Sequence, residues 1–285
     1  MLPYYVISYL KDCTRRLKKG QPPPGVSGAV CSEINVINRD VYGSNICLSL
    51  EIQVLYTMNV IVDDLLLAGR QPTVAHVEIL VGTLMSWGRI GGRGGNFKLA
   101  EQSRVNPQGT VLSIVRLLDI DISGRPLREY ALSRDIANIE KSDMDGIVAS
   151  AVNALGGSYR STWTYKTLHI VMPSIFPAFD GNIARNVLSD NPSERGNSMN
   201  KKNYVLYSAC LGRLAGYYVE NCGSEFERVK GFGYARKLYL QGGTTLYLPI
   251  TRLLDYIVWS MSSSPDPKIK RSVYDIVREN CLSIA

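Results

Sequence analysis

Residues 165–188 read YKTLHIVMPSIFPAFDGNIARNVL, and this stretch decides the fold that the rest of the chain has to complete. Apolar residues at helical spacing lead to Pro173 and Pro177, which cannot continue a helix and force a return loop. Asp180 then stands immediately before a second helical segment, at a preferred N-cap position. The stretch therefore predicts a helix, a proline turn and a capped helix.

Lys166 and Asp180 stand near the two ends of this stretch and are candidates for a catalytic pair. The helical residues from Lys166 to Met172 rise only about 10 Å, and the loop residues 173–179 span at most roughly 24 Å. The chain can therefore bring Asp180 back beside Lys166. Each residue also has a simpler explanation by itself, because a lysine at a helix start is commonly solvated and an aspartate before a helix commonly caps it.

Helical spacing also dominates the rest of the chain, and only the region around 111–122 leaves room for short strands. We therefore expect an all-α fold, with residues 1–285 forming a single helical domain of two lobes and residues 140–190 forming its Lys/Asp-bearing core. The expected helices are 2–18, 48–68, 73–87, 109–118, 143–155, 162–172, 181–188, 201–221, 225–240, 248–262 and 268–282.

The charge of the chain favours a nucleic-acid partner. A formal net charge of +7 attracts polyanions through phosphate contacts and counterion release. The most apolar run, 46–69, contains Glu51, Asp63 and Asp64, which are costly at bilayer depth, so this run predicts a buried helix. We expect DNA, as duplex or single strand, to be the partner, and we expect no membrane association.

The cysteines and histidines predict neither a metal site nor a disulfide framework. The six cysteines show no CxxC pairing, and only His76 and His169 are available to complete a metal site. Scattered thiols are typical of a reducing compartment, so we expect a cytoplasmic protein that uses no metal and no cofactor. The acidic pairs at 63–64, 119–121 and 143–145 could suggest a metal-dependent nuclease, but we interpret them as helix caps and surface charges.

The central stretch resembles the core of the helix-hairpin-helix DNA glycosylase superfamily, which includes endonuclease III and the archaeal 8-oxoguanine glycosylases. The archaeal branch is the nearest, because RLLDYIVWSM (252–261) is similar to a helix near its end and LVGTLMSWGRIGGRGG (80–95) to its early helix and glycine-rich turn. The residues of the central match are Lys166, Thr167, Pro177, Asp180, Ile183 and Arg185.

The resemblance implies a DNA glycosylase or lyase that flips its target nucleotide out of the helix. Asp180 is then the catalytic carboxylate, which stabilises positive charge at C1′ and accepts a proton from the nucleophile. Lys166, with its pKa lowered by desolvation, is expected to attack C1′, form a Schiff base and permit strand scission. Without an active Lys166, Asp180 could activate water, and base loss would occur without lyase activity.

Three segments supply candidate contacts to nucleic acid: GRIGGRGGNFK, SYRSTWTYK and the matched stretch itself. Basic residues in ERVKGFGYARKLY add a later basic surface. For each contact the alternative is a solvated face or a buried aromatic side chain; Trp163 is expected in the core, and Asp255 as a buried partner of a helix end or an arginine. The candidate contacts are Arg89, Arg93, Lys98, Arg160, Tyr165 and Arg185.

A second hypothesis comes from a departure from the family pattern. The usual leucine-proline-glycine-valine-glycine hairpin before the lysine is replaced by GGSYRSTWTY (156–165), which lacks the backbone amides that would grip a phosphate. The chain could therefore be a catalytically silent or repurposed member of the fold. Such a protein would bind nucleic acid, or would serve as an accessory subunit with a protein partner in a nucleic-acid-processing or defence complex.

Overall fold

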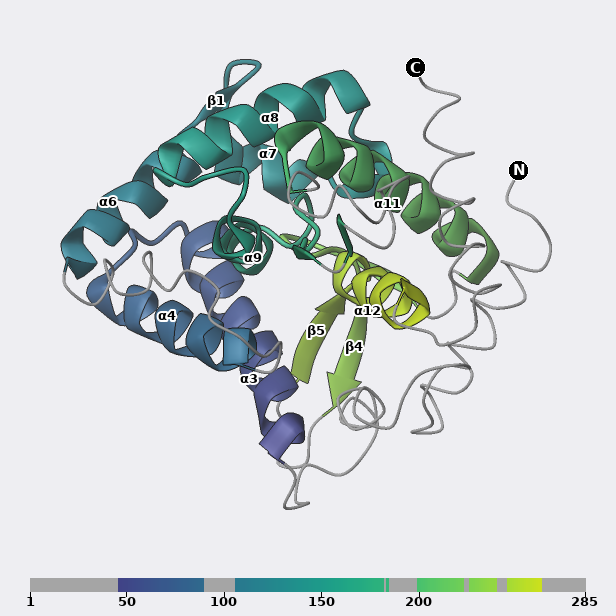
Figure 1. Ribbon diagram of the computed structural model, residues 1–285, viewed down its shortest axis with the longest axis horizontal. Coiled ribbons are helices and arrows are strands. Elements are labelled where there is room, and N and C mark those ends of the chain that lie inside the picture. The colour runs from purple at the N-terminus through teal and green to yellow at the C-terminus, as the bar shows by residue number, and fades with distance from the viewer. Residues whose placement is uncertain are drawn as a thin grey trace.

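The computed structural model describes residues 46–89, 106–181, 183–184, 199–222, 226–239 and 245–262. This part of the chain is mostly helical and contains two small antiparallel sheets, β1–β2 and β3–β4–β5 (Figure 1). The helices are α3 (Ile46–Ile61), which continues into the π-helical turn η1 (Val62–Leu67), α4 (Val74–Arg89), α6 (Pro107–Leu118), α7 (Leu127–Ser133), the 3-10 turn η2 (Ile136–Asn138), α8 (Lys141–Ala154), α9 (Thr162–Val171), α11 (Lys201–Cys222) and α12 (Ile250–Ser262). The strands are β1 (Asp121–Ile122), β2 (Arg125–Pro126), β3 (Glu227–Val229), β4 (Gly233–Tyr239) and β5 (Thr245–Pro249).

Helix α9 lies at the centre of the molecule in Figure 1, with α3 and α4 on one side and α8 and α11 on the other. Five of its ten residues are apolar, and the other five are three threonines, Lys166 and His169. Eight of its ten residues are buried, and Thr162 and Lys166 are the two that are not. Lys166 is therefore the one charged side chain that the central helix carries toward solvent.

The return loop after α9 is buried throughout residues 172–179. Water cannot reach its backbone, so its carbonyl groups need donors from the protein itself. These donors are Thr251 Oγ1 for Pro173 O (2.7 Å), His169 Nδ1 for Phe176 O (2.8 Å) and Tyr204 OH for Pro177 O (3.0 Å). Because Tyr204 belongs to α11 and Thr251 to α12, the loop is the point at which three helices are joined.

Ser174 joins the same loop to α7 and η2. Its hydroxyl donates to Ala131 O (3.1 Å), and its carbonyl accepts from Ile136 N (2.8 Å). Helix α11 then approaches η2 so closely that a Cβ at Gly212 would lie 2.1 Å from Ile136 O. Only glycine allows this contact between the two backbones.

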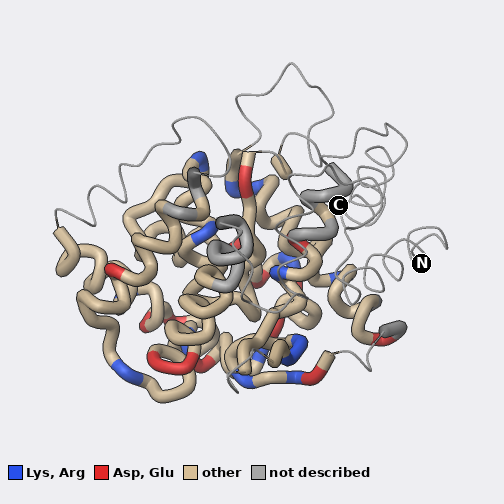
Figure 2. The backbone as a smooth tube through the Cα atoms, turned by 90° about the horizontal axis from the view of Figure 1, so that it is seen from below, with Lys and Arg blue, Asp and Glu red and all other residues tan. Residues whose placement is uncertain are grey.

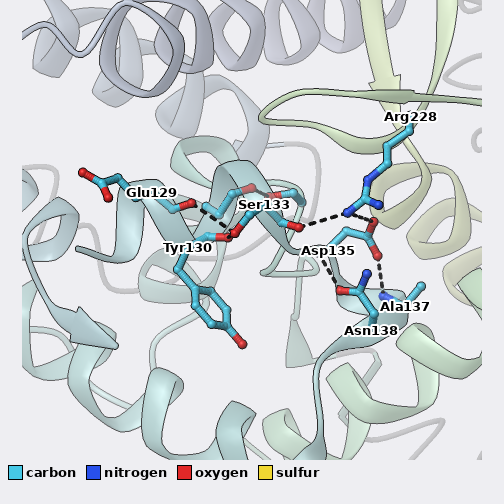
Figure 3. A network of polar contacts seen from close by, with 9 residues as sticks. Glu129, Tyr130, Ser133, Asp135, Ala137, Asn138 and Arg228 are labelled. Atoms are coloured by element: carbon cyan, nitrogen blue, oxygen red, sulfur yellow. Dashed lines mark hydrogen bonds and ion pairs between the residues drawn. The ribbon is translucent and has the colours of Figure 1, made fainter. Parts of the chain in front are cut away.

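A polar network fixes β3 to the segment between α7 and η2 (Figure 3). Asp135 Oδ1 accepts from Ala137 N (3.0 Å), and Asn138 Oδ1 accepts from Asp135 N (3.1 Å), so the 3-10 turn begins with a capping box. Arg228 Nη2 donates to Ser133 O (3.0 Å) and lies 3.8 Å from Asp135 Oδ2. Arg228 therefore has a structural role.

The three-stranded sheet is closed on one edge by a side chain from α3. Asn59 Oδ1 accepts from Tyr247 N (2.9 Å), while Asn59 Nδ2 donates to Tyr247 O (3.1 Å). One amide thus satisfies both backbone groups of Tyr247, as a neighbouring strand would, and protects this edge of β5. The turn before β4 requires glycine, because Gly233 has a φ of +67° and its Cβ would lie 2.7 Å from Asp135 Cβ.

Most expected helices are confirmed within a few residues of their predicted ends. The confirmed segments are 48–68, 73–87, 109–118, 143–155, 162–172, 201–221 and 248–262. The helix expected over 225–240 is wrong, because that segment forms β3 and β4, and the two sheets correct the all-α expectation to a mostly helical fold. Residues 2–18, 185–188 and 268–282 lie outside the described residues, and the division into two lobes stays a prediction.

Two further expectations concern the location of the protein. Among the described helices, none is long and apolar enough to cross a membrane. Cys210 is disulfide-bonded, so the expectation that the cysteines are scattered thiols is wrong for this residue. The cysteine pattern therefore no longer supports a reducing compartment, and the cytoplasmic location stays a prediction.

Tyr204→Phe should lower the free energy of unfolding by about 1–3 kcal/mol, because it leaves Pro177 O buried without its donor. Urea unfolding followed by circular dichroism measures the change. The matched control is Tyr239→Phe, at a side chain that is 79% exposed, where we expect less than about 0.5 kcal/mol. Equal effects of the two substitutions would contradict the role of this hydrogen bond in holding the loop.

Candidate functional site

Lys166 contacts the ring of Trp87, which α4 brings to the side of α9. The Lys166 Nζ atom lies 4.2 Å from the centroid of the Trp87 ring. The guanidinium carbon of Arg252, from α12, lies 4.3 Å from the same centroid. Two cations therefore share one aromatic ring, and each gains attraction from its negative π face.

Arg252 also forms a buried ion pair within its own helix. Its Nη1 atom lies 2.8 Å from Asp255 Oδ2, and the two side chains are only 3% and 8% exposed. Tyr207 OH donates to Asp255 Oδ1 at 3.3 Å. Buried charges are tolerated when they are paired and hydrogen-bonded, so these three residues form a self-consistent polar layer. The expectation that Asp255 is a buried partner of an arginine is confirmed.

Asp180 caps the helix that follows it, as its position in the sequence predicts. Its Oδ1 atom accepts from Ile183 N at 2.9 Å, and its side chain is half-buried. Its negative charge is also close enough to Asp255 to raise the pKa of that carboxyl group, while the positive charge of Lys166 lowers it. Lys166 and Asp180 thus lie within electrostatic range of the same buried carboxyl group.

We call Lys166, Asp180, Arg252 and Asp255 the charge cluster. Its members come from α9, from the end of the buried loop and from α12. Lys166 and Asp180 are partly exposed, whereas Arg252 and Asp255 are buried beneath them. An outer pair that solvent or a ligand can reach therefore rests on an inner pair that is sealed from water.

Burial raises the pKa of Asp255 from 3.8 to about 7. The positive charges of Arg252 and Lys166 and the hydrogen bond from Tyr207 lower the pKa of Asp255. The negative charge of Asp180 raises it further. The loss of hydration is the largest of these effects, so Asp255 changes its charge near neutral pH. The net charge that the inner layer presents to Lys166 and Asp180 changes over the same range.

His169 lies one helical turn after Lys166 and stays neutral. Burial, with Arg252 and Lys166 nearby, lowers its pKa to about 3, although its hydrogen bond to Phe176 O acts in the opposite direction. Its Nδ1 atom carries the proton, because the carbonyl group of Phe176 can only accept. Its Nε2 atom is buried and has no hydrogen-bond partner among the described residues. The ring of Trp87 lies 6.2 Å away, centroid to centroid.

The structure does not bring the expected nucleic-acid contacts together. Arg160 is exposed, whereas Tyr165 is fully buried against Tyr204, with 4.1 Å between their ring centroids. Tyr165 is therefore a core residue and cannot stack on a base in this structure, so we no longer count it as a contact. Trp163 lies in the core, as expected. The side chain of Arg89 and the residues Arg93, Lys98 and Arg185 lie outside what the structure describes.

Three residues of the site were not identified from sequence: Trp87, His169 and Arg252. Trp87 and Arg252 lie in the two outer segments that resemble the glycosylases, 80–95 and 252–261. The resemblance therefore pointed to these segments but did not single out the two residues. His169 stands three residues after Lys166, on the same side of a helix. As for metals, within the described ranges no group of three or more His, Cys, Asp or Glu side chains is placed to hold an ion.

Asp255→Asn should remove a dependence of stability on pH. With its pKa raised to about 7, the folded state holds one more proton than the unfolded state between pH 3.8 and about 7. The free energy of unfolding of the wild type should therefore fall as pH rises across this range and level off above it. Urea unfolding at pH 4.5, 6 and 8 measures this slope, which Asp255→Asn should flatten.

The control for this prediction is Asp145→Asn, at an exposed carboxylate that pairs with Lys201. It should leave the slope between pH 4.5 and pH 8 as in the wild type. A slope that survives in Asp255→Asn would show that another group titrates over this range.

Comparison of the chain with known proteins adds no relative to this description. No protein-family model, no curated protein and no solved structure matches it.

Proposed function

We propose that the protein binds DNA and cleaves the N-glycosidic bond of a flipped base, with Lys166 as nucleophile and Asp180 as catalytic carboxylate. One observation supports this proposal above the others: a partly exposed amine and a partly exposed carboxylate, 14 positions apart in sequence, lie around the same buried carboxyl group. The mostly helical fold and the net charge of +7 are compatible with it.

The proposed reaction begins with the neutral amine of Lys166. Its Nζ atom attacks C1′ of the flipped nucleotide, the bond from C1′ to the base nitrogen breaks, and its electron pair leaves with the base, which takes a proton from water. Asp180 stabilises the positive charge that develops at C1′ and accepts the proton that the attacking amine releases. Opening of the sugar ring then gives a Schiff base, and elimination of the 3′ phosphate cuts the strand.

The buried layer supports these roles through orientation and charge. The Nζ atom of Lys166 lies 4.2 Å from the centroid of the Trp87 ring, and Arg252 lies over the same ring, so these neighbours limit where the amine can move. The hydrogen bond that Asp180 Oδ1 accepts from Ile183 N fixes the direction of this carboxylate. A reacting pair gains most from such fixed positions, because orientation lowers the entropic part of the barrier.

A second candidate is nucleic-acid binding without chemistry, by a repurposed protein or an accessory subunit of a nucleic-acid-processing or defence complex. The specific observation that favours it is that both candidate catalytic groups already have structural contacts. Asp180 Oδ1 accepts the N–H of Ile183, and Lys166 Nζ contacts the ring of Trp87. The substitutions Asp180→Asn and Lys166→Gln distinguish the two candidate functions.

Asp180→Asn should decrease base release at least about 100-fold, in line with the usual effect of one acid–base or electrostatic group. Asparagine caps helices about as well as aspartate, so we expect a loss of stability of only about 0.3–1 kcal/mol. Duplexes and single strands that carry a panel of modified bases serve as substrates. Lys166→Gln should abolish covalent trapping of the enzyme on DNA by borohydride.

Thermal unfolding of both variants is the control, since a misfolded protein would also lose activity. If the wild type and both variants release no base from any substrate while DNA binding persists, the catalytic proposal is wrong. The second candidate, nucleic-acid binding without chemistry, is then correct.

Arg89→Ala together with Arg93→Ala should weaken binding to all DNA sequences alike and decrease the dependence of affinity on salt. Each lost phosphate contact reduces the slope of log affinity against log salt concentration by about 0.9 for duplex DNA. A filter-binding titration at several salt concentrations measures the slope. An unchanged slope would remove the glycine-rich segment from the binding surface.

A further inference from the structure

The three-stranded sheet carries an excess of positive charge that the charge cluster does not use. Basic and acidic residues are interspersed along the described backbone (Figure 2). Leaving out Arg228, which is bound to Ser133 O, residues 226–239 and 245–249 contain three cations and one carboxylate, Glu227, which gives a net charge of +2 (3 − 1). The three cations are Lys230, Arg236 and Lys237, and Arg236 lies on the opposite face of β4 from Lys237.

Tyr239 is the most exposed large aromatic or aliphatic side chain that the structure describes, at 79%. It stands at the end of β4 and is paired with Thr245 of β5, while Lys237 is paired with Tyr247. Alternate residues of a strand point to the same face, roughly 6.6 Å apart. Lys237 and Tyr239 therefore place a cation and a free aromatic ring side by side on one face.

The contacts of Lys237 leave it available to a ligand. It pairs with Glu227 at 2.8 Å, but the two side chains are 38% and 49% exposed. Water screens an ion pair in such a position, so it contributes little to stability and a phosphate can replace the carboxylate. Arg228 is different, because it is bound to Ser133 O beside Asp135, and we exclude it from the surface.

The edges of the sheet argue against a peptide strand as the occupant. Asn59 closes one edge by bonding both backbone groups of Tyr247, and the other edge strand, β3, has only three residues. Addition of a further strand needs a longer free edge. A cation beside an exposed aromatic ring is instead typical of surfaces that bind unpaired nucleotides, where a phosphate contacts the cation and a base stacks on the ring.

We propose that the face of β4 formed by Lys237 and Tyr239 binds single-stranded nucleic acid, with a base stacked on Tyr239 and a phosphate on Lys237. Stacking selects a single strand, because the bases of a duplex have their faces covered. This inference rests on the nucleic-acid-binding part of the proposed function and not on the chemistry of Lys166 and Asp180.

The test is fluorescence anisotropy with a labelled oligothymidylate of roughly 20 nucleotides, compared with a duplex of equal length. Tyr239→Ala should weaken single-strand binding on the order of 10-fold, while Tyr239→Phe, which keeps the aromatic face, should bind as the wild type does. Lys237→Gln should lower the salt slope for the single strand by about 0.7. The matched control is Arg116→Gln, at an exposed cation of α6, which should leave both quantities unchanged.

Several results would overturn the inference. The inference is wrong if Tyr239→Ala and Lys237→Gln both bind the single strand as tightly as the wild type. That result is the one expected if this face binds a protein and not a nucleic acid. An equal loss for the single strand and the duplex would exclude stacking. Absence of any nucleic-acid binding by the wild type would overturn both this inference and the proposed function. If Tyr239→Ala keeps full affinity while Asp180→Asn loses base release, only the present inference fails.

Discussion

A buried loop can exist only where each of its backbone carbonyls finds a donor, and this requirement organises the structure. The loop at 172–179 contains two prolines, so it can form little regular structure of its own. Three of its carbonyls accept hydrogen bonds from Thr251 and Tyr204, which belong to different helices, and from His169 of the helix that precedes it. The helices are consequently held in one arrangement by hydrogen bonds as well as by apolar packing.

The same principle applies to charge beneath Lys166 and Asp180. Arg252 and Asp255 are expensive to bury, and their ion pair offsets that cost only in part, as the raised pKa of Asp255 indicates. A layer of apolar residues at these positions would be an easier way to stabilise the helix. The presence of buried charges next to a partly exposed amine and carboxylate is therefore an argument for a role in binding or chemistry.

The sequence predicts this fold well where the spacing of apolar residues alone determines the secondary structure. It predicts the fold poorly where contacts between distant parts of the chain determine the structure. Segments such as 48–68 and 201–221 have apolar residues at helical spacing over several turns, and both are helices. In 225–240 the apolar spacing also fits a helix, but glycines with positive φ at 231 and 233 end it and favour a turn between strands. Asp180 was identifiable because a cap is local; Trp87 and Arg252 were not, because only tertiary packing brings them to Lys166.

The sheet and the charge cluster are joined by the chain itself. Strand β5 ends at Pro249, and α12 begins at the next residue, Ile250. Proline has a fixed φ and suits the residue just before or at the start of a helix, so the angle between strand and helix has little freedom. Asn59 fixes β5 on one side of this junction, and the hydrogen bond from Thr251 to the buried loop fixes α12 on the other. The position of Arg252 relative to β4 is thus set by covalent geometry and buried hydrogen bonds, which leaves the two surfaces in a constant relation to each other.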